Sequence, residues 1–145
     1  MSKATPVVVL DASGLLASAF GEPGGEQVRP LIAEAMISAA NWSEFVQKVQ
    51  QHGVNTNGMR SELEGAGLRI VPVSAQHAEA AAALWVMGRS LGLSLADRLC
   101  LALGLAQASR VYTADRAWCQ LPALPDLEVI CIRPAQVLHQ QSSGA

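Results

Sequence analysis

The chain has 145 residues, of which 50% are hydrophobic and 15% charged, and its formal net charge is −2. This length is typical of one domain, and the charged fraction lies below the roughly 25% usual in soluble domains, so we expect apolar surface to be available for a partner. The negative charge excludes a broad basic surface, so any contact with nucleic acid would need a local patch or a bound metal ion.

Apolar stretches separated by glycine and proline predict alternating strands and helices. In chain order they are strand 6–10, helices 13–20 and 26–35, strand 36–38, helices 41–52 and 57–66, strand 68–73, helices 75–91 and 94–108, strand 110–113, helix 115–121 and strand 127–132. The first strand is a continuous β-branched run, which indicates burial on both faces. Pro72 places the third strand near a sheet edge.

This alternation is typical of an α/β fold, and we expect a three-layer α/β/α domain with a central parallel sheet. A single domain is predicted over 1–135, followed by a polar tail over 136–145 that we expect to be disordered. The segment 1–6 lacks the apolar region of a signal peptide, and no apolar run approaches the ~20 residues of a membrane span. We therefore expect a cytoplasmic protein without membrane contact.

The three cysteines show neither paired nor zinc-binding spacing. They are Cys100, Cys119 and Cys131, and two of them lie in apolar runs. We interpret them as buried free thiols in a reducing compartment.

Acidic residues stand at the predicted strand ends, where open parallel sheets bind their ligands. Asp11 directly follows the first strand, and Asp115 lies two residues beyond the fourth. Glu44 is in the first turn of the helix after the second strand, and Asp97 is in the first turn of the helix over 94–108. We expect the four acids to face the same rim of the sheet.

Each acid also has a purely structural interpretation, because carboxylates are favourable near helix N-termini. Asp11 and Asp115 precede short helices, and capping-box spacing occurs at 41–44 and at 94–97. Four acids at one rim would nevertheless repel one another, and a divalent cation relieves that repulsion best. The pattern predicts a site for Mg²⁺ or Mn²⁺ that could act on a phosphodiester.

Four segments resemble the signature motifs of the PIN domain, and the VapC-type ribonuclease toxins of bacterial toxin–antitoxin pairs match best. The segments are 8–13, 37–44, 92–98 and 112–118, and the resemblance covers about residues 7–133. It implies a metal-dependent endoribonuclease, with Asp11, Glu44, Asp97 and Asp115 as catalytic and metal-binding acids and a Mg²⁺- or Mn²⁺-activated water as the nucleophile. It also implies an RNA substrate, a cognate VapB-like antitoxin and a homodimer.

The same resemblance assigns supporting roles to Ser13 and Thr113 near the metal and to Asn41 on the rim. Arg98 and Arg116 each follow a proposed ligand and could contact substrate phosphate, although a salt bridge or a solvated surface position is the more common role for such residues. The histidines, His52, His77 and His139, have no partner spacing, and we expect surface or helix-end positions. For the tryptophans we expect packing in the core or in an interface.

Three other functions fit parts of the pattern. A phosphoacceptor domain needs an adjacent acidic pair and a lysine at a late strand end, whereas Lys3 and Lys48 are not so placed. A phosphatase of the haloacid dehalogenase type needs Asp-x-Asp, and position 13 is serine. A non-catalytic interaction module of PIN-like fold, with the acids serving only as caps, stays open as the alternative.

Overall fold

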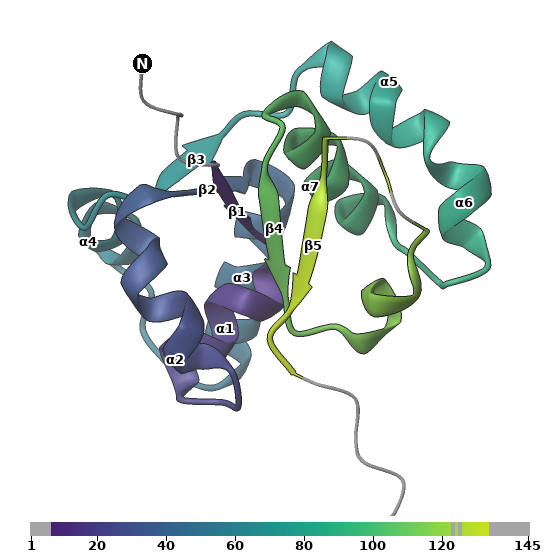
Figure 1. The fold of residues 1–145 in the computed structure, drawn as a ribbon. Helices are drawn as coiled ribbons and strands as arrows, with labels where there is room; N and C mark the ends of the chain where they lie inside the picture. The colour runs from purple at the N-terminus through teal and green to yellow at the C-terminus, as the bar shows by residue number, and fades with distance from the viewer. Residues whose placement is uncertain (1–6, 123, 125, 134–145) are drawn as a thin grey trace, which may run out of the picture.

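The central element of the computed structural model is a five-stranded parallel sheet of order β3-β2-β1-β4-β5 (Figure 1). The structure describes residues 7–122, 124 and 126–133. The strands are β1 (Val8–Leu10), β2 (Ala35–Ser38), β3 (Arg69–Val71), β4 (Arg110–Thr113) and β5 (Glu128–Cys131). The parallel sheet and the edge position of β3 confirm the sequence predictions, while the predicted tail 136–145 and His139 lie outside the described residues.

Helices cover both faces of the sheet. The α-helices are α1 (Ala12–Phe20), α2 (Gly25–Val28), α3 (Ala39–Gln51), α4 (Met59–Gly65), α5 (Ala75–Ala83), α6 (Trp85–Arg89) and α7 (Leu95–Ala106), and the 3₁₀ helices are η1 (Arg29–Glu34) and η2 (Arg116–Gln120). No helix of the described chain is long and apolar enough to cross a membrane.

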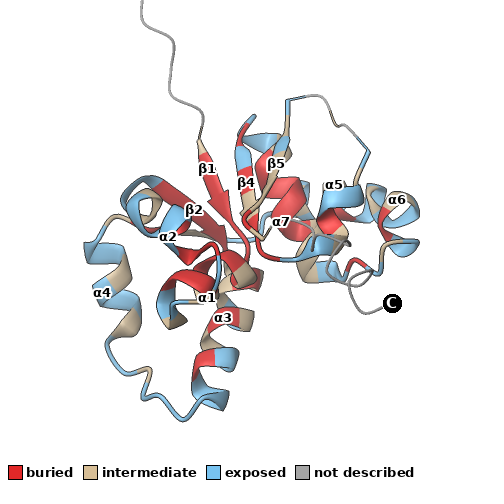
Figure 2. Ribbon diagram, turned by 60° about the horizontal axis from the view of Figure 1, so that its bottom comes forward, coloured by how far each residue is buried: buried red, intermediate tan, exposed pale blue. Residues whose placement is uncertain are grey.

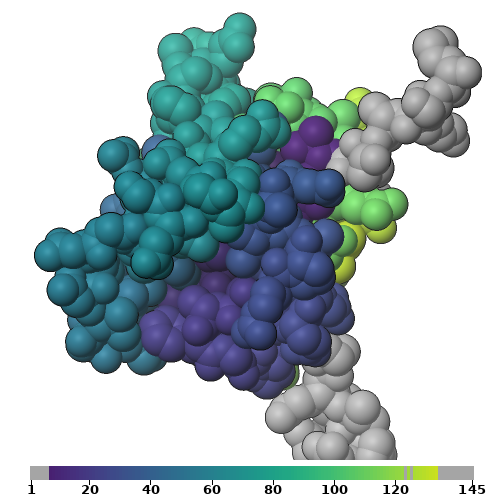
Figure 3. Space-filling model, turned by 90° about the vertical axis from the view of Figure 1, so that its left-hand side faces the viewer, coloured from purple at the N-terminus to yellow at the C-terminus, as the bar shows by residue number. Residues whose placement is uncertain are grey.

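The two larger hydrophobic clusters of the described residues lie on opposite sides of the sheet, because successive side chains of a strand point to opposite faces. Val8 and Leu10 of β1 pack in a core with α1 and α3, whereas Val9 packs with α7 on the other face. Figure 2 shows the buried strands between the helices of the two sides. Figure 3 views the side where α1 lies between α4 and the α2–η1 segment. This arrangement confirms the three-layer α/β/α prediction.

The prediction of one continuous helix over 26–35 is wrong. Helix α2 ends at Val28, η1 follows as a 3₁₀ helix, and Ala35 already belongs to β2. The break has a physical cause in Pro30, which has no N–H to donate to the carbonyl four residues before it, so the α-helical hydrogen bonds cannot continue past α2.

The helix predicted over 75–91 is divided at Leu84 into α5 and α6. At this break the Ala81 carbonyl accepts from the Leu84 N–H at 3.2 Å and from the Arg98 guanidinium at 2.8 Å. The second donor comes from α7, so a tertiary contact that the local pattern does not contain helps to end the helix.

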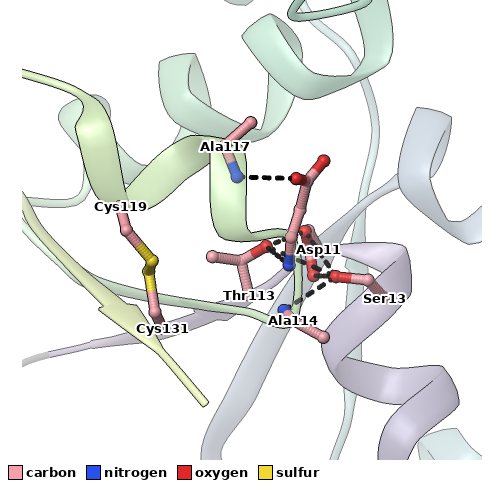
Figure 4. The surroundings of a disulfide bond; sticks show 8 residues. Asp11, Ser13, Thr113, Ala114, Ala117, Cys119 and Cys131 are labelled. Carbon is pink, nitrogen blue, oxygen red and sulfur yellow. Dashed lines mark hydrogen bonds between the residues drawn. A yellow bond between two sulfur atoms is a disulfide. The ribbon is translucent and has the colours of Figure 1, made fainter. Parts of the chain in front are cut away.

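The prediction of three free thiols is wrong for two cysteines. Cys119 of η2 and Cys131 of β5 form a disulfide with a Cα–Cα separation of 6.1 Å (Figure 4). Strand β5 lies beside β4, and η2 follows β4 in the chain, so the fold brings together two cysteines that are 12 positions apart. Cys100 is a buried free thiol, as predicted.

Candidate functional site

The four predicted acids line one pocket at the carboxyl ends of the strands. The pocket has a volume of about 180 Å³ and is lined by Asp11, Ala12, Ser13, Leu16, Glu44, Lys48, Asp97 and Asp115. All strands of the sheet are parallel, so their carboxyl ends meet at this edge. The expectation that the four acids share a rim of the sheet is therefore confirmed.

Asp11 is the most buried of these acids, with 4% of its surface exposed. It follows β1 directly and is the N-cap of α1, where Oδ1 accepts from the Gly14 N–H at 2.7 Å. Oδ1 also accepts from the Ser13 hydroxyl at 2.8 Å, and the Thr113 hydroxyl donates to Oδ2. Both oxygens are thus held in fixed directions.

Ser13 and Thr113 extend this network to the segment after β4 (Figure 4). The Ser13 hydroxyl accepts from the Ala114 N–H at 2.9 Å, and the Thr113 hydroxyl accepts from the Asp115 N–H at 3.0 Å. The two hydroxyls therefore link the start of α1 to the segment that carries Asp115. Both hydroxyls contact Asp11, and their supporting role near a metal ion stays a prediction.

Asp97 and Asp115 also take part in capping helices. The Asp97 carboxylate accepts from the Ser94 N–H at 2.9 Å, and the Ser94 hydroxyl accepts from the Asp97 N–H at 3.1 Å, which completes the predicted capping box. Asp115 caps η2 and accepts from the Ala117 N–H at 2.9 Å.

The capping box predicted over 41–44 does not form, because α3 begins earlier, at Ala39, with Ser38 as its N-cap. Glu44 instead accepts from the Asn41 side-chain amide at 3.2 Å. The same amide donates to the Ala96 carbonyl at 3.2 Å, one residue before Asp97. Asn41, which we expect on the rim, is 1% exposed and connects α3 to the start of α7.

Burial makes ionisation of Asp11, Glu44 and Asp97 costly. It raises the pKa of Asp11 from 3.8 to about 6, against the opposing hydrogen bonds from Thr113, Gly14 and Ser13. Burial also raises the pKa of Glu44 and of Asp97, and the nearby Asp97 charge adds to the rise at both Asp11 and Glu44. The pocket therefore concentrates negative charge that a cation would stabilise.

Neither of the two arginines proposed as phosphate contacts lines the pocket as described. Arg98 donates to a carbonyl of α5 and fastens α5 to α7, which is a structural role. Arg116 is exposed at the start of η2. The basic side chain that does line the pocket is Lys48, which the sequence interpretation passed over. The sequence feature that points to Lys48 is its position one helical turn after Glu44 on α3.

The donor set of the pocket fits a hard divalent cation. Among the described residues no group of three or more Asp, Glu, His or Cys side chains is arranged to hold a metal ion on its own. Mg²⁺ usually keeps several waters and needs few protein carboxylates. Within the described chain one oxygen each of Glu44, Asp97 and Asp115 has no hydrogen-bond donor, while their other oxygens are held by one. These three oxygens are free to bind a metal ion beside Asp11.

The fold and the acidic pocket define an α/β domain with a carboxylate site at the carboxyl ends of a parallel sheet. The family model described as PIN domain matches residues 8–124. The chain therefore belongs to the PIN domain family, as its motifs indicated. A comparison with curated protein sequences finds no significant match.

Several solved structures share the fold. A toxin–antitoxin complex from Klebsiella pneumoniae contains a chain with a TM-score of 0.64 and 18% identity, and the alignment covers 87% of this chain and 98% of that one. FitAcB from Neisseria gonorrhoeae aligns with a TM-score of 0.59 and 19% identity over 86% and 97% of the two chains. VapBC2 from Rickettsia felis, bound to a DNA fragment from its promoter, aligns with a TM-score of 0.59 and 15% identity over 84% and 96%.

Proposed function

We propose that this protein is a metal-dependent endoribonuclease and the toxin of a toxin–antitoxin pair. The observation that carries the proposal is the pocket itself, where buried Asp11 lies with three further acids at the carboxyl ends of the strands. If the acids served only as helix caps, there would be no reason for three of them to share one pocket and to have raised pKa values.

The ligands in this proposal are Asp11, Glu44, Asp97 and Asp115, holding Mg²⁺ or Mn²⁺. When bound, such an ion supplies positive charge for a phosphodiester and activates a water molecule. The protein fixes the direction of its carboxylates beforehand. Ser13 and Thr113 orient Asp11, Ser94 orients Asp97, and the α3 amide of Asn41 orients Glu44. Such preorganisation lowers the cost of assembling the site.

The first experiment is cleavage of single-stranded and structured RNA by the purified protein, with Mg²⁺ or Mn²⁺ and with EDTA. Asp97→Asn is the test variant, since an asparagine oxygen still accepts from the Ser94 N–H and preserves the cap. Glu79→Gln, an exposed acid on α5, is the matched control. We expect metal-dependent cleavage that is lost in Asp97→Asn and kept in Glu79→Gln.

No cleavage of several RNAs with either metal, together with no metal binding by calorimetry, would contradict the proposal. The acids would then be caps only, and a non-catalytic interaction module would become the better interpretation.

The partners are part of the same proposal. Solved relatives of the fold are described as toxin–antitoxin complexes, one of them with promoter DNA, and we propose a VapB-like antitoxin and a homodimer for this chain. Co-expression with the open reading frame beside its gene, followed by light scattering, tests both. If the protein is a monomer and the product of the neighbouring reading frame does not bind it, the proposed partners are rejected.

A further inference from the structure

We propose that α1 and α3 form a subsite for single-stranded RNA beside the acidic pocket, with Lys48 contacting a phosphate and the Phe20–His52 ring pair stacking with a base. The inference deepens the proposed ribonuclease function and rests on it. It concerns residues that neither the family motifs nor the acids themselves identify.

The two helices lead away from the pocket in the same direction. Both follow parallel strands, so both begin at the carboxyl edge of the sheet, and they pack against each other (Figure 1). On α1, Ser13 and Leu16 line the pocket, and Phe20 lies one turn beyond Leu16. A stripe of side chains on α1 thus leads from the pocket to Phe20 at the end of the helix.

Helix α3 carries the matching stripe. Glu44, Lys48 and His52 are spaced four residues apart and share one face of the helix. At 1.5 Å rise per residue, Lys48 lies about 6 Å and His52 about 12 Å beyond Glu44 along the helix axis. Within the described chain Lys48 is the one basic side chain that lines the pocket. It offers a phosphate the positive charge that the acids lack.

An aromatic pair closes the far end of both stripes. The rings of Phe20 and His52 stack with centroids 4.4 Å apart and an interplanar angle of 24°. His52 Nδ1 lies 2.9 Å from the Lys48 carbonyl, and since a carbonyl only accepts, Nδ1 carries the proton and the ring is held in place. Phe20 is half-buried, whereas His52 is exposed, so the pair is available to a ligand.

The electrostatics favour a base over a phosphate at this end. Phe20 is the last residue of α1 and His52 is the C-cap of α3, so the partial negative charge of two helix ends lies there. Phosphates are disfavoured near that charge, but a base can stack on the rings. A strand with its scissile phosphate in the pocket would therefore place its next phosphate at Lys48 and a flanking base at the ring pair.

The test measures binding without cleavage. We would use a fluorescein-labelled oligoribonucleotide with the Asp97→Asn protein in Mg²⁺, and follow anisotropy over a series of salt concentrations. Lys48→Gln should lower the slope of log affinity against log salt by about 0.7, the value for one phosphate contact with a single strand. Arg69→Gln removes one exposed charge at the opposite ends of the strands and should leave the slope unchanged.

The ring pair is tested in the same assay. His52→Ala and Phe20→Leu should each weaken binding roughly tenfold, the range for loss of one stacked base. Phe20→Tyr keeps a ring and should bind like the parent, and Trp85→Ala, an exposed aromatic on α6, should have no effect. A duplex of the same sequence should not respond to either ring variant, because its bases are already stacked.

The inference is overturned if the parent protein does not bind the probe, or if it binds but the Lys48 and ring variants match the controls while remaining folded. These outcomes differ from failure of the proposed nuclease. If substitution of Lys48 or His52 leaves cleavage unchanged, the subsite is rejected and the nuclease proposal stands. If the probe binds along α3 but the unsubstituted protein does not cleave RNA, the nuclease proposal alone is rejected.

Discussion

Replacing Asp11 by asparagine should stabilise the metal-free protein at neutral pH. The pKa of Asp11 is raised by burial from 3.8 to about 6. A carboxyl group with this shift keeps its proton in the folded protein over a pH range where the unfolded chain has already lost it. Folding is then less favourable above pH 6 than below pH 3.8 by about 3 kcal/mol, at 1.36 kcal/mol for each pKa unit.

The contribution of Asp11 to the free energy of unfolding is therefore largest at low pH. Below pH 3.8 the group is protonated in both states and its full contribution is present, and that contribution is lost as pH rises through about 6. Asparagine carries no charge at any pH, so Asp11→Asn should lack this fall. It also keeps an oxygen for the Gly14 N–H and remains a good N-cap.

The gain should be smaller than the full 3 kcal/mol. The asparagine NH₂ would replace the oxygen that accepts from Thr113, so the hydroxyls of Ser13 and Thr113 would have to turn and accept instead. One such hydrogen bond is worth about 1 kcal/mol. We therefore expect Asp11→Asn to be more stable than the unsubstituted protein by about 1–2 kcal/mol at pH 7.5.

Urea denaturation in EDTA at pH 4.5 and pH 7.5 measures the effect, with Asp11→Ala, which also removes the cap, as the destabilised comparison. Added Mg²⁺ should raise the midpoint of the unsubstituted protein and leave Asp11→Asn nearly unchanged. The reasoning is refuted if Asp11→Asn is the less stable protein at pH 7.5, or if the unsubstituted protein gains stability between the two pH values without metal.

Three further outcomes follow from single contacts. Thr113→Val removes a buried donor to the Asp11 carboxylate and should lower the free energy of unfolding by about 2 kcal/mol, measured as a lower urea midpoint in EDTA. An unchanged midpoint would mean that the hydroxyl contributes nothing to stability. Reducing the Cys119–Cys131 disulfide, which closes a loop of about a dozen residues, should cost about 3 kcal/mol, and the reductant should have no effect on a protein with serine at both positions. Arg98→Met leaves a carbonyl of α5 without its guanidinium donor and should lower the free energy of unfolding by about 1–2 kcal/mol. It should also speed amide hydrogen exchange in α5 and α6, and unchanged exchange there would contradict the structural role of Arg98.

The sequence predicted what depends on neighbours along the chain. A strand followed by an acid can be recognised locally, and parallel topology then brings Asp11 and Asp115 to one edge. The capping box at 94–97 is equally local and was predicted correctly. Pro30 is equally local, and its missing N–H accounts for the end of α2 without any tertiary contact.

Features that depend on tertiary contacts could not be predicted in the same way. The division of the 75–91 helix involves a guanidinium that reaches Ala81 from α7. The disulfide exists because η2 packs beside β5. Burial of Asn41 depends on the distance between α3 and α7, which no spacing along the chain reports.

Position 11 separates the two interpretations of the acids better than the capping geometry does. As a cap alone, Asp11 has no advantage over asparagine, which caps helices equally well and does not require ionisation. The buried carboxylate costs stability near neutral pH, and the hydroxyls of Ser13 and Thr113 offset only part of that cost. Such a residue is favourable at this position when its charge is used by a cation. If Asp11 is kept for its charge, Asp11→Asn should both gain stability without metal and lose the stabilisation by Mg²⁺. The two urea experiments therefore test the same use of the Asp11 carboxylate.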